Sequence, residues 1–470
     1  MSIANTHFGA EGIKKLLDGC RSIFFIGIGG INMSSLAHIS HVRGYKVGGS
    51  DRTCTALTER LAGEGIEIKL GHSADNMIGY DAVVYTVAIS EDNPELVYAK
   101  EHDLPCISRA DFLGYIMTGY SHRIGVSGMH GKSTCTSMLA HVFMDSDADP
   151  TVMSGAELSE MGGAYRIGRS ENFIFEACEY MDSFLSFYPS IAIVLNIEMD
   201  HVDYFHSMEQ INASFAAFMD RTLLSDDDRR AVLNFDDDNV RMLAENFAGE
   251  VVSFGVNSTS AAYRACNIRY PRGRAEFDVL YEGVFAAHIK LSVPGEHNVY
   301  NALAAFAAAH SLGLDVDGIV KGLGSFVGAK RRMELKGKLR GADVYDDYGH
   351  HPTEVSSTLA GVAKMGYERV WCVYQPHTYS RTAELIEDFA RAFDHADRVV
   401  LADIYAARET NTYGVTSARL ASLIGEKAEY IDSFEKISAH LRANVEEGDV
   451  VIIMGAGDIY KVFSHLELCD

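Results

Sequence analysis

A glycine-rich segment, residues 125–134 (GVSGMHGKST), contains the residue types that bind phosphate groups. In a loop of this kind the backbone amides surround the phosphates, Lys132 neutralises the β and γ oxygens, and the Ser133 hydroxyl ligates Mg²⁺. The usual spacing puts glycine at position 126, where this chain has valine, so the loop is a variant. We interpret it as an ATP site, with a structural turn as the alternative. The candidate nucleotide-binding residues are Gly128, Met129, His130, Gly131, Lys132, Ser133 and Thr134.

A second glycine-rich turn, residues 27–32 (GIGGIN), lies between an apolar run and a helical pattern. The backbone N–H groups of such a turn, together with a helix N-terminus, can face a diphosphate. The dinucleotide-binding pattern has a third glycine where this chain has Asn32. The turn therefore indicates a nucleotide diphosphate, and it leaves a nicotinamide cofactor and a structural turn open. Its candidate binding residues are Gly27, Gly29, Gly30 and Asp51.

Carboxylates follow two of the expected buried strands and could complete a magnesium site. Glu176 and Glu179 close one strand, and the segment 196–201 (NIEMDH) closes another. Strand ends beside a phosphate loop are where metal carboxylates lie in open α/β sheets. Histidine is an unusual Mg²⁺ ligand, so His201 is either at the metal or a hydrogen-bonding loop residue. The candidate metal residues are Ser133, Glu179 and His201.

Two further segments contain histidine or arginine in a polar setting. Residues 346–354 (DDYGHHPTE) hold the adjacent pair His350 and His351 among carboxylates. A zinc site is disfavoured there because the pair lacks helical i, i+4 spacing and no cysteine is near, so acid–base or substrate-orienting work is expected. Residues 375–382 (QPHTYSRT) offer Arg381 as a planar fork for a carboxylate. For each segment a plain loop is the alternative.

The elements that position these residues follow an α/β pattern. The 470 residues correspond to about three domains, and short apolar runs alternate with helical patterns, which predicts parallel strands joined by helices in doubly wound sheets. Residues 251–293 alternate like antiparallel strands instead. We place the domain limits near 122 and 330, giving 1–122, 123–330 and 331–470. Strands are expected at 22–28, 45–48, 81–86, 173–175, 191–197, 370–374, 399–402 and 450–454, and helices at 33–42, 94–102, 135–144 and 302–309.

Composition excludes several classes of partner. With 41 Lys and Arg against 65 Asp and Glu, the net charge of −24 disfavours nucleic acid and anionic membrane surfaces. No apolar run reaches the ~18 residues of a membrane span, and the stretch 23–31 is interrupted by glycine, unlike a signal peptide. The eight cysteines contain no CxxC pair, which indicates reduced thiols and a cytoplasmic protein. The oligomeric state stays open between monomer and homodimer.

Taken together and in this order, the motifs resemble the Mur ligase family, the ATP-dependent amide-forming enzymes of peptidoglycan assembly. The resemblance extends from about residue 22 to 460 and rests on HGKST, EACE at 176–179, NIEMDH, GEHNVYNALAA at 295–305, DDYGHHPTE, QPHTYSRT and GAGD at 455–458. Within the family the pair DYGHHPTE and QPHTYSRT is most similar to members that join L-alanine to UDP-N-acetylmuramate. A ligase that recycles murein tripeptide is the alternative within the family.

The resemblance implies a Rossmann-like UDP-sugar domain, a central P-loop ATPase-type domain and a Rossmann-like amino-acid domain. It implies ATP and Mg²⁺ as cofactors and small-molecule substrates. It also assigns expected roles to residues of this chain. Lys132 is the phosphate-loop lysine; Ser133, Glu179 and His201 lie near magnesium; Asn298, Asn301, Arg332 and Asp347 contact the nucleotide; and His350, His351 and Arg381 border the alanine pocket.

Four positions depart from the family pattern. Asn32 replaces a glycine, Cys178 replaces a common aspartate, and Ser133 replaces threonine conservatively. Thr378 stands where arginine is common, which makes Arg381 the stronger candidate for carboxylate binding. Because the loop lysine and the metal candidates are retained, activity is still expected.

The implied chemistry is phosphoryl transfer from ATP to a carboxylate, followed by attack of an amine on the acyl phosphate. The candidate catalytic residues are Lys132, His201, His350 and Arg381. The amine needs a base, and His201 and the 350–351 pair are equally open as that base. Two rival classes remain: a nicotinamide-dependent dehydrogenase built on the turn at 27–32, and a P-loop regulatory switch that binds a protein.

Overall fold

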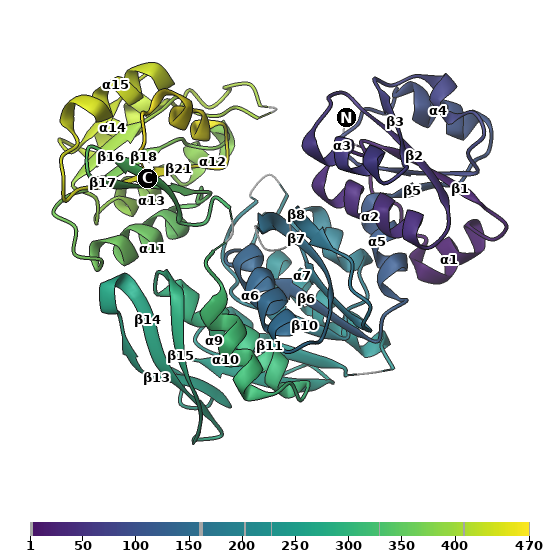
Figure 1. The fold of residues 1–470 in the computed structure, drawn as a ribbon, viewed down its shortest axis with the longest axis horizontal. Coiled ribbons are helices and arrows are strands. Elements are labelled where there is room, and N and C mark those ends of the chain that lie inside the picture. The colour runs from purple at the N-terminus through teal and green to yellow at the C-terminus, as the bar shows by residue number, and fades with distance from the viewer. Residues whose placement is uncertain are drawn as a thin grey trace.

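The computed structural model describes residues 3–158, 163–201, 204–226, 228–328, 330–407 and 409–469. These residues form three β-sheets of five, ten and six strands, which follow one another along the chain. In Figure 1 the N-terminal and C-terminal domains lie at the upper right and upper left, and the central domain lies below and between them. The predicted class, a three-domain α/β protein, is confirmed.

The N-terminal sheet contains only parallel strands, in the order β3-β2-β1-β4-β5. Phe24 and Ile26 of β1 pack into one apolar cluster, whereas Phe25 packs into another. Successive side chains of a strand point to opposite faces, so both faces of this sheet are covered. The strands are β1 (Ser22–Ile26), β2 (Lys46–Asp51), β3 (Glu67–Leu70), β4 (Ala82–Tyr85) and β5 (Cys106–Ser108), and the helices are α1 (Gly9–Leu16), α2 (Ile31–Val42), α3 (Ala56–Gly63), α4 (Pro94–Glu101) and α5 (Arg109–Met117).

The central sheet has the order β15-β14-β13-β12-β11-β10-β6-β9-β7-β8. Its middle strands are parallel, and β13, β14 and β15 form an antiparallel edge. The antiparallel pairing predicted for 251–293 is therefore found from β13 onward, whereas β12 pairs in parallel with both of its neighbours. The strands are β6 (His122–Ser127), β7 (Thr151–Leu158), β8 (Gly163–Arg166), β9 (Asn172–Glu176), β10 (Ile191–Val194), β11 (Arg230–Asn234), β12 (Glu250–Gly255), β13 (Tyr263–Arg269), β14 (Arg274–Tyr281) and β15 (Val284–Pro294). The helices are α6 (Lys132–Asp145), α7 (Met208–Asp220), α8 (Asp238–Ala244), α9 (His297–Ser311) and α10 (Val316–Ser325).

The C-terminal sheet has the order β16-β17-β21-β18-β19-β20, and only its edge pair β16–β17 is antiparallel. Ile452 and Ile453, adjacent on β21, belong to different apolar clusters, so this sheet also is covered on both faces. The strands are β16 (Glu334–Leu339), β17 (Ala342–Asp347), β18 (Val370–Tyr374), β19 (Arg398–Leu401), β20 (Ala428–Tyr430) and β21 (Val450–Met454), and the helices are α11 (Pro352–Ala363), α12 (Tyr379–Glu384), α13 (Ile386–Ala392), α14 (Ser417–Ile424) and α15 (Phe434–Asn444).

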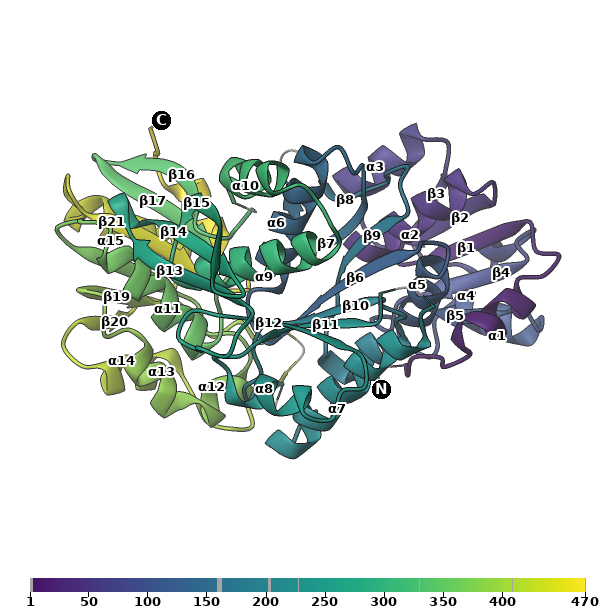
Figure 2. The ribbon, with the colours of Figure 1, turned by 90° about the horizontal axis from the view of Figure 1, so that it is seen from below.

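The three domains are joined in two different ways. One apolar cluster includes Phe112 of α5 together with Phe184 and Phe187 of the central domain, so the N-terminal and central cores are continuous. The clusters of the C-terminal domain, in contrast, contain only residues from 333 onward among those described. Figure 2 shows the central sheet between the two outer domains. The C-terminal domain therefore meets its neighbour through contacts other than a shared core.

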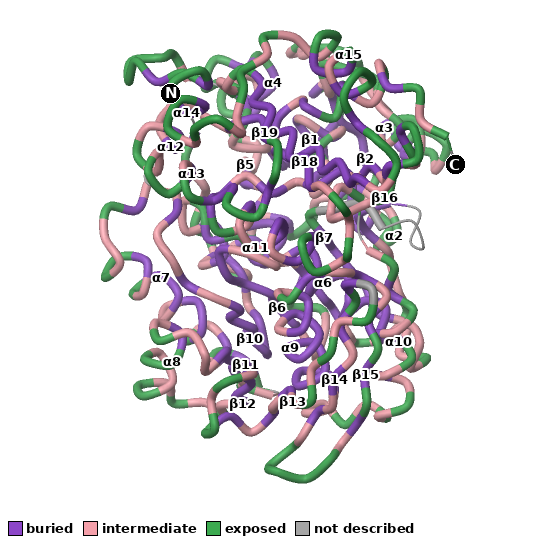
Figure 3. The backbone as a smooth tube through the Cα atoms, turned by 90° about the vertical axis from the view of Figure 1, so that its left-hand side faces the viewer, coloured by how far each residue is buried: buried purple, intermediate pink, exposed green. Residues whose placement is uncertain are grey.

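Burial explains why the apolar runs formed these strands. The buried positions in Figure 3 follow the middle strands of the sheets, including β6, β10 and β18. The run 302–309 is wholly buried within α9. The strands predicted at 370–374 and 450–454 match β18 and β21 in their bounds. Among the described residues, no helix combines the length and apolar character needed to cross a bilayer.

Candidate active site

The phosphate-loop candidate connects β6 to α6, the strand–loop–helix context that its sequence predicted. Gly131 precedes α6 with a φ of +85°, and a Cβ at this residue would lie only 2.5 Å from Asn301 Oδ1. Glycine is required here both for its left-handed backbone and for this close approach. The Asn196 side chain holds the loop from the end of β10, because it accepts the His130 N–H at 2.8 Å and donates to the His130 carbonyl at 3.0 Å.

Four of the predicted catalytic and metal residues converge at the loop. Lys132 Nζ lies 3.0 Å from a carboxylate oxygen of Glu179, and His201 Nε2 lies 3.1 Å from the other. The Ser133 hydroxyl donates to Glu176 at 2.8 Å. Burial disfavours the ammonium, but the Glu179 carboxylate raises the pKa of Lys132 above its usual value, so the lysine stays charged.

These groups fit a magnesium ion by the chemistry of their donors. Mg²⁺ prefers hard oxygen ligands from one or two carboxylates plus phosphate oxygens. The Ser133 hydroxyl and the carboxylates of Glu176 and Glu179 supply such oxygens, and all three line one cavity. The imidazole of His201 borders the same cavity and contacts Glu179, which places it close enough either to join the metal site or to orient the carboxylate.

Of two cavities at this site, the larger receives residues from all three domains. Its volume is about 770 Å³. Ile31 at the start of α2 lines it from the N-terminal domain, Lys132 from the central domain and His350 from the C-terminal domain. A molecule in this cavity would therefore contact the helix that follows the first glycine turn, the phosphate loop and the histidine pair together.

The first glycine turn has the geometry of an anion-binding turn at a helix start. Gly27 has a φ of +82°, and α2 begins at Ile31 directly after Gly30. The Gly29 N–H donates to the Asp51 carboxylate at 2.9 Å, and a Cβ on Gly29 would lie 2.8 Å from that carboxylate. The structure therefore brings the predicted residues of this turn together, with Asp51 held against the turn by one of its amides.

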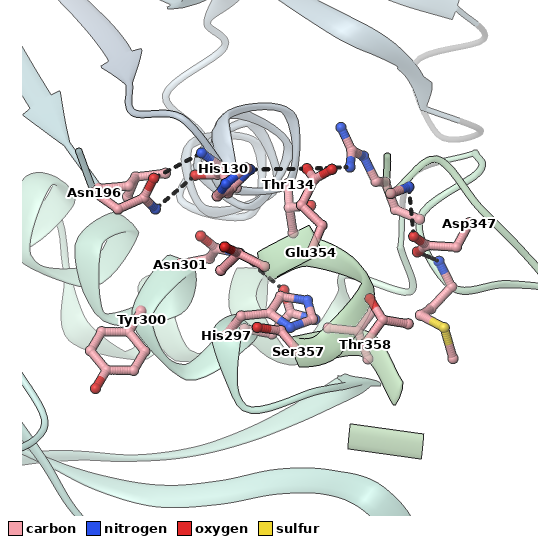
Figure 4. Close-up of a pocket in the computed structure, with 18 of the residues that line it drawn as sticks. His130, Thr134, Asn196, His297, Tyr300, Asn301, Asp347, Glu354, Ser357 and Thr358 are labelled. Atoms are coloured by element: carbon pink, nitrogen blue, oxygen red, sulfur yellow. Dashed lines mark hydrogen bonds and ion pairs between the residues drawn. The ribbon is translucent and has the colours of Figure 1, made fainter. Parts of the chain in front are cut away.

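The predicted nucleotide residues of the second half of the chain line a smaller cavity of about 350 Å³ beside the loop (Figure 4). Asn301 Nδ2 donates to Asn298 Oδ1 at 3.1 Å, and Asn298 Nδ2 donates to the Pro294 carbonyl at 2.6 Å. Asp347 accepts the Met333 N–H at 2.9 Å and the Gly349 N–H at 2.8 Å. Its burial raises the pKa of Asp347. The cavity lining comprises His130, Gly131, Thr134, Asn298, Asn301, Arg332, Asp347 and further residues of both domains.

Arg381 lies at the interface between the central and C-terminal domains. Its Nε and Nη2 both donate to Asp200 Oδ1, at 3.2 and 3.0 Å, and its Nη1 lies 3.4 Å from His377 Nδ1. Only 8% of Arg381 is exposed, so this is a buried ion pair. Two of the Arg381 N–H donors that we expected to bind a substrate carboxylate therefore bind Asp200 instead. The ion pair also connects the central and C-terminal domains.

The adjacent histidines face different surroundings. His350 lines the larger cavity; its Nδ1 lies 3.2 Å from the Tyr348 carbonyl, and burial lowers its pKa to about 4. The His351 ring instead caps α11, with Nδ1 accepting the Thr353 N–H at 3.3 Å, and its ring centroid lies 4.9 Å from that of His130. Only His350 is thus placed at the larger cavity.

Two of the sequence departures also lie near the site. Cys178 is exposed at the wall of the larger cavity, and desolvation there together with the Glu179 carboxylate raises the pKa of its thiol to about 11, so the thiol is protonated at neutral pH. Thr378 has a φ of +66°, unusual for a β-branched residue, and its N–H donates to the Tyr405 carbonyl at 2.9 Å. This hydrogen bond anchors the backbone at residue 378 in that conformation.

Three acidic residues of the site have partners that the sequence did not predict. Glu198 and Asp200 extend from the loop after β10, and Glu354 lies in the first turn of α11. Each contacts a cationic or polar group across the domain boundary: Glu198 contacts Thr353, Asp200 contacts Arg381, and Glu354 contacts His130. The sequence signal for these residues was limited to their positions inside the segments 196–201 and 346–354, because their partners are more than 100 residues away.

Models of three families cover most of the chain. The "Mur ligase family, catalytic domain" model matches residues 22–121, the "Mur ligase middle domain" model matches 126–309, and the "Mur ligase, glutamate ligase domain" model matches 331–457. These matches follow the N-terminal, central and C-terminal sheets.

Individual proteins show the same similarity. A UDP-N-acetylmuramate–L-alanine ligase of Clostridium novyi is 44% identical, covering 95% of this chain and 97% of its own length. The crystal structure of a UDP-N-acetylmuramate–alanine ligase from Thermotoga maritima superposes with a TM-score of 0.78 at 29% identity, over 94% of this chain and 98% of that one. A murein peptide ligase from Psychrobacter arcticus shares the fold at 24% identity, with a TM-score of 0.71 over 96% of this chain and 100% of that one. With three successive Mur ligase models on its three sheets and a 44% identical relative along nearly its whole length, this chain belongs to the Mur ligase family.

Proposed function

We propose that this protein joins L-alanine to the lactyl carboxylate of UDP-N-acetylmuramate, with conversion of ATP to ADP and phosphate, in peptidoglycan biosynthesis. One observation carries the proposal: a single cavity is lined by the start of α2, by Lys132 of the phosphate loop and by His350. A ligase must bring three substrates to one point, and this cavity provides that point. The names of the similar ligases from Clostridium novyi and Thermotoga maritima support the same substrates.

The proposal gives each domain one substrate. Residues 1–122 bind the UDP sugar through Gly27, Gly29, Gly30 and Asp51; residues 123–330 bind ATP; and residues 331–470 bind the amino acid. Support comes from the glycine turn at the N-terminus of α2, which suits a diphosphate, and from the loop before α6. Asn298, Asn301, Arg332 and Asp347 would hold the nucleoside in the smaller cavity.

In the first step a carboxylate oxygen of the sugar attacks the γ-phosphorus and ADP leaves, giving an acyl phosphate. Lys132 is charged and its side chain is only 13% exposed, so its ammonium would stabilise the negative charge that develops on the transferred group. Mg²⁺, when bound, would neutralise the β and γ oxygens. Ser133 and Glu179 would hold that ion, with Glu176 and His201 beside them.

In the second step the alanine amine attacks the acyl carbon, phosphate leaves, and the amine gives up a proton. We assign the proton to His350 because its Nδ1 faces the Tyr348 carbonyl, which leaves Nε2 with a lone pair, and because burial keeps the ring uncharged. His201 is less suited, since its Nε2 already contacts Glu179. Arg381 would act by fixing the C-terminal domain against Asp200.

The test is a product assay with purified protein, ATP, Mg²⁺, UDP-N-acetylmuramate and L-alanine. ADP and phosphate should form only when both other substrates are present, in amounts equal to UDP-N-acetylmuramoyl-L-alanine. Lys132→Ala should lower the rate by ~100-fold or more. Lys321→Ala, which removes an exposed lysine of α10, should leave the rate unchanged. Formation of AMP and pyrophosphate, or hydrolysis that neither substrate stimulates, would contradict the proposal.

The recycling alternative differs only in the nucleophile. Murein tripeptide and L-alanine should therefore compete in one reaction, with product masses showing which is joined. We expect the alanine product, since the 44% identical relative is an alanine ligase. A tripeptide product in excess would assign the chain to recycling instead.

We also place the protein in the cytoplasm. All eight cysteines are free thiols, which suits a reducing compartment. Detection of the tagged protein in a fractionated cell would test this placement.

A further inference from the structure

His130 of the phosphate loop lies between two carboxylates that come from different domains. Its Nδ1 is 3.3 Å from Glu354 Oε1 of α11 in the C-terminal domain, and its Nε2 contacts Glu198 Oε1 of the central domain. The His130 and Glu354 side chains are only 15% and 11% exposed. Figure 4 shows His130 and Glu354 facing each other above the smaller cavity. Both ring nitrogens of His130 therefore face acceptors.

The surroundings keep this histidine charged. Burial alone would favour the neutral ring, but Glu354 and Glu198 raise the pKa of His130 to about 10. The other charged or titratable groups nearby are Arg332, whose Nη1 lies 3.7 Å from Glu354, His350, whose Nδ1 lies 3.4 Å from Glu354, and the rings of His351 and His297. An imidazolium between two carboxylates is thus the form present at neutral pH.

The cluster also has the composition of a metal site, since ligand atoms of His130, Glu198 and His351 lie within 4.8 Å of one another. The hydrogen bonds argue against that use. His351 Nδ1 accepts the Thr353 N–H at 3.3 Å, so the proton of a neutral His351 ring is on Nε2, the buried atom that lacks a partner. A protonated Nε2 cannot ligate a metal, which leaves two ligands.

These contacts join the phosphate loop to the C-terminal domain, so they affect how the parts of the active site are brought together. The C-terminal domain shares no apolar cluster with the central domain among the described residues, so polar contacts decide where it docks. Glu354 lines both cavities and accepts the His350 N–H at 2.8 Å, which links it to the histidine of the larger cavity. His130 belongs to the loop that would bind the phosphates.

We propose that His130 is a positioning residue: its imidazolium, held by Glu198 and Glu354, couples the nucleotide loop to the docked C-terminal domain, so that His350 and the loop reach their working positions together. The inference rests on the proposed ligase function. It adds to that function an interdomain contact that acts through Glu354 and α11.

Glu354→Gln and His130→Asn test the contact. Glutamine keeps the acceptor that caps α11, where Glu354 receives the His350 and His351 N–H groups, and removes only the charge. Asn196 bonds the His130 backbone and therefore still holds the loop in His130→Asn. Each variant should lower kcat about tenfold, with the KM for UDP-N-acetylmuramate unchanged. The double variant should lose no more than the stronger single variant, because both remove one contact.

The matched control is Glu296→Gln, which also removes the charge of an interdomain ion pair, here to Lys364 at 2.8 Å on the exposed surface. It should change kcat less than about twofold, since exposed pairs contribute little. The coupling would be overturned if the kcat losses of the two single variants multiplied in the double variant. It would also be overturned if the single variants lost no more kcat than Glu296→Gln loses.

The dependence of kcat on pH provides a measurement that a folding defect would not change. The wild-type His130 stays protonated until pH approaches 10. Without the Glu354 charge its pKa falls, so kcat of Glu354→Gln should decline between pH 7 and 9, relative to the wild type. A profile parallel to the wild type would contradict the proposal, and so would a stoichiometric Zn²⁺ site that His130→Asn abolishes. A wild-type protein that forms no alanine product would instead overturn the proposed function.

Discussion

At neutral pH the side chains His297, His350 and His377 are uncharged, because burial lowers the pKa of each to about 4, with Arg332 or Arg381 adding to the effect in His297 and His377. His130, equally enclosed, is charged because two carboxylates face it. The residue type alone therefore does not determine which of these histidines is protonated. What decides it is whether burial or a neighbouring carboxylate contributes more.

The uncharged histidines predict a loss of stability in acid. Below the ordinary pKa of 6.5 the unfolded chain binds the proton first, so the free energy of unfolding falls as the pH drops from 6.5 toward 4. For His377 the loss is up to about 2 kcal/mol at pH 5. Urea unfolding of His377→Gln should show a smaller difference between pH 7.5 and pH 5 than the wild type shows. His395→Gln, at an exposed position, serves as the control and should match the wild type.

At the scale of elements, the strand–loop–helix unit β6–α6 places the phosphate loop at the carboxyl end of a buried strand. The loop packs against α9 through Gly131 and Asn301 and against the end of β10 through Asn196. Two elements that are distant from the loop in the chain thus help to determine its backbone conformation. The loop glycines permit this conformation, and the neighbouring elements select it.

Gly131→Ala tests this packing. The substitution adds a Cβ 2.5 Å from Asn301 Oδ1 at a residue with φ of +85°, so it should displace the loop and raise the KM for ATP at least tenfold. Gly313→Ala is the matched control because Gly313 has a φ of +80° with no atom within 4 Å of the added Cβ. Both variants should lose about 1–2 kcal/mol of stability from the left-handed backbone, but only the first should lose nucleotide affinity. Equal KM values in the two variants would show that packing at Gly131 does not control binding.

At the scale of the whole molecule, the two domain interfaces differ in kind. The N-terminal and central domains share an apolar core, whereas the C-terminal domain is attached to the central domain by polar pairs such as Asp200–Arg381. Apolar interfaces keep domains fixed, and small polar interfaces permit movement. Since the ATP-side candidates Arg332 and Asp347 lie beyond the central domain, the cavity that holds them is complete only when the C-terminal domain is docked.

Asp200→Asn should weaken this docking. Asparagine leaves the buried Arg381 charge without its counter-charge, which costs about 3 kcal/mol for pairs of this kind. We expect a lower unfolding temperature in calorimetry and a lower kcat. Asp388→Asn removes an exposed pair with Arg391, with side chains 55% and 72% exposed, and should change stability by less than about 0.5 kcal/mol. Indistinguishable behaviour of the two variants would exclude a docking role for Asp200.

The sequence by itself determined the α/β class, because buried strands require apolar runs such as 191–197 and 450–454. It also determined the phosphate loop, because glycines at this spacing before a helix have few other uses. These are local properties, which neighbouring residues carry together. The motif order was enough to indicate the family.

Only the tertiary structure decided which partners the charged groups have. Glu198 and Glu354 are 156 residues apart in the chain and both contact His130, and Asp200 meets Arg381 across 181 residues. From the sequence we expected Arg381 to bind a substrate carboxylate, whereas in the structure two of its N–H donors bind Asp200. The physical reason is that burying a charged group is costly unless a partner compensates for the loss of water. The packing of whole domains determines which partner is within reach, and no local sequence pattern encodes that packing.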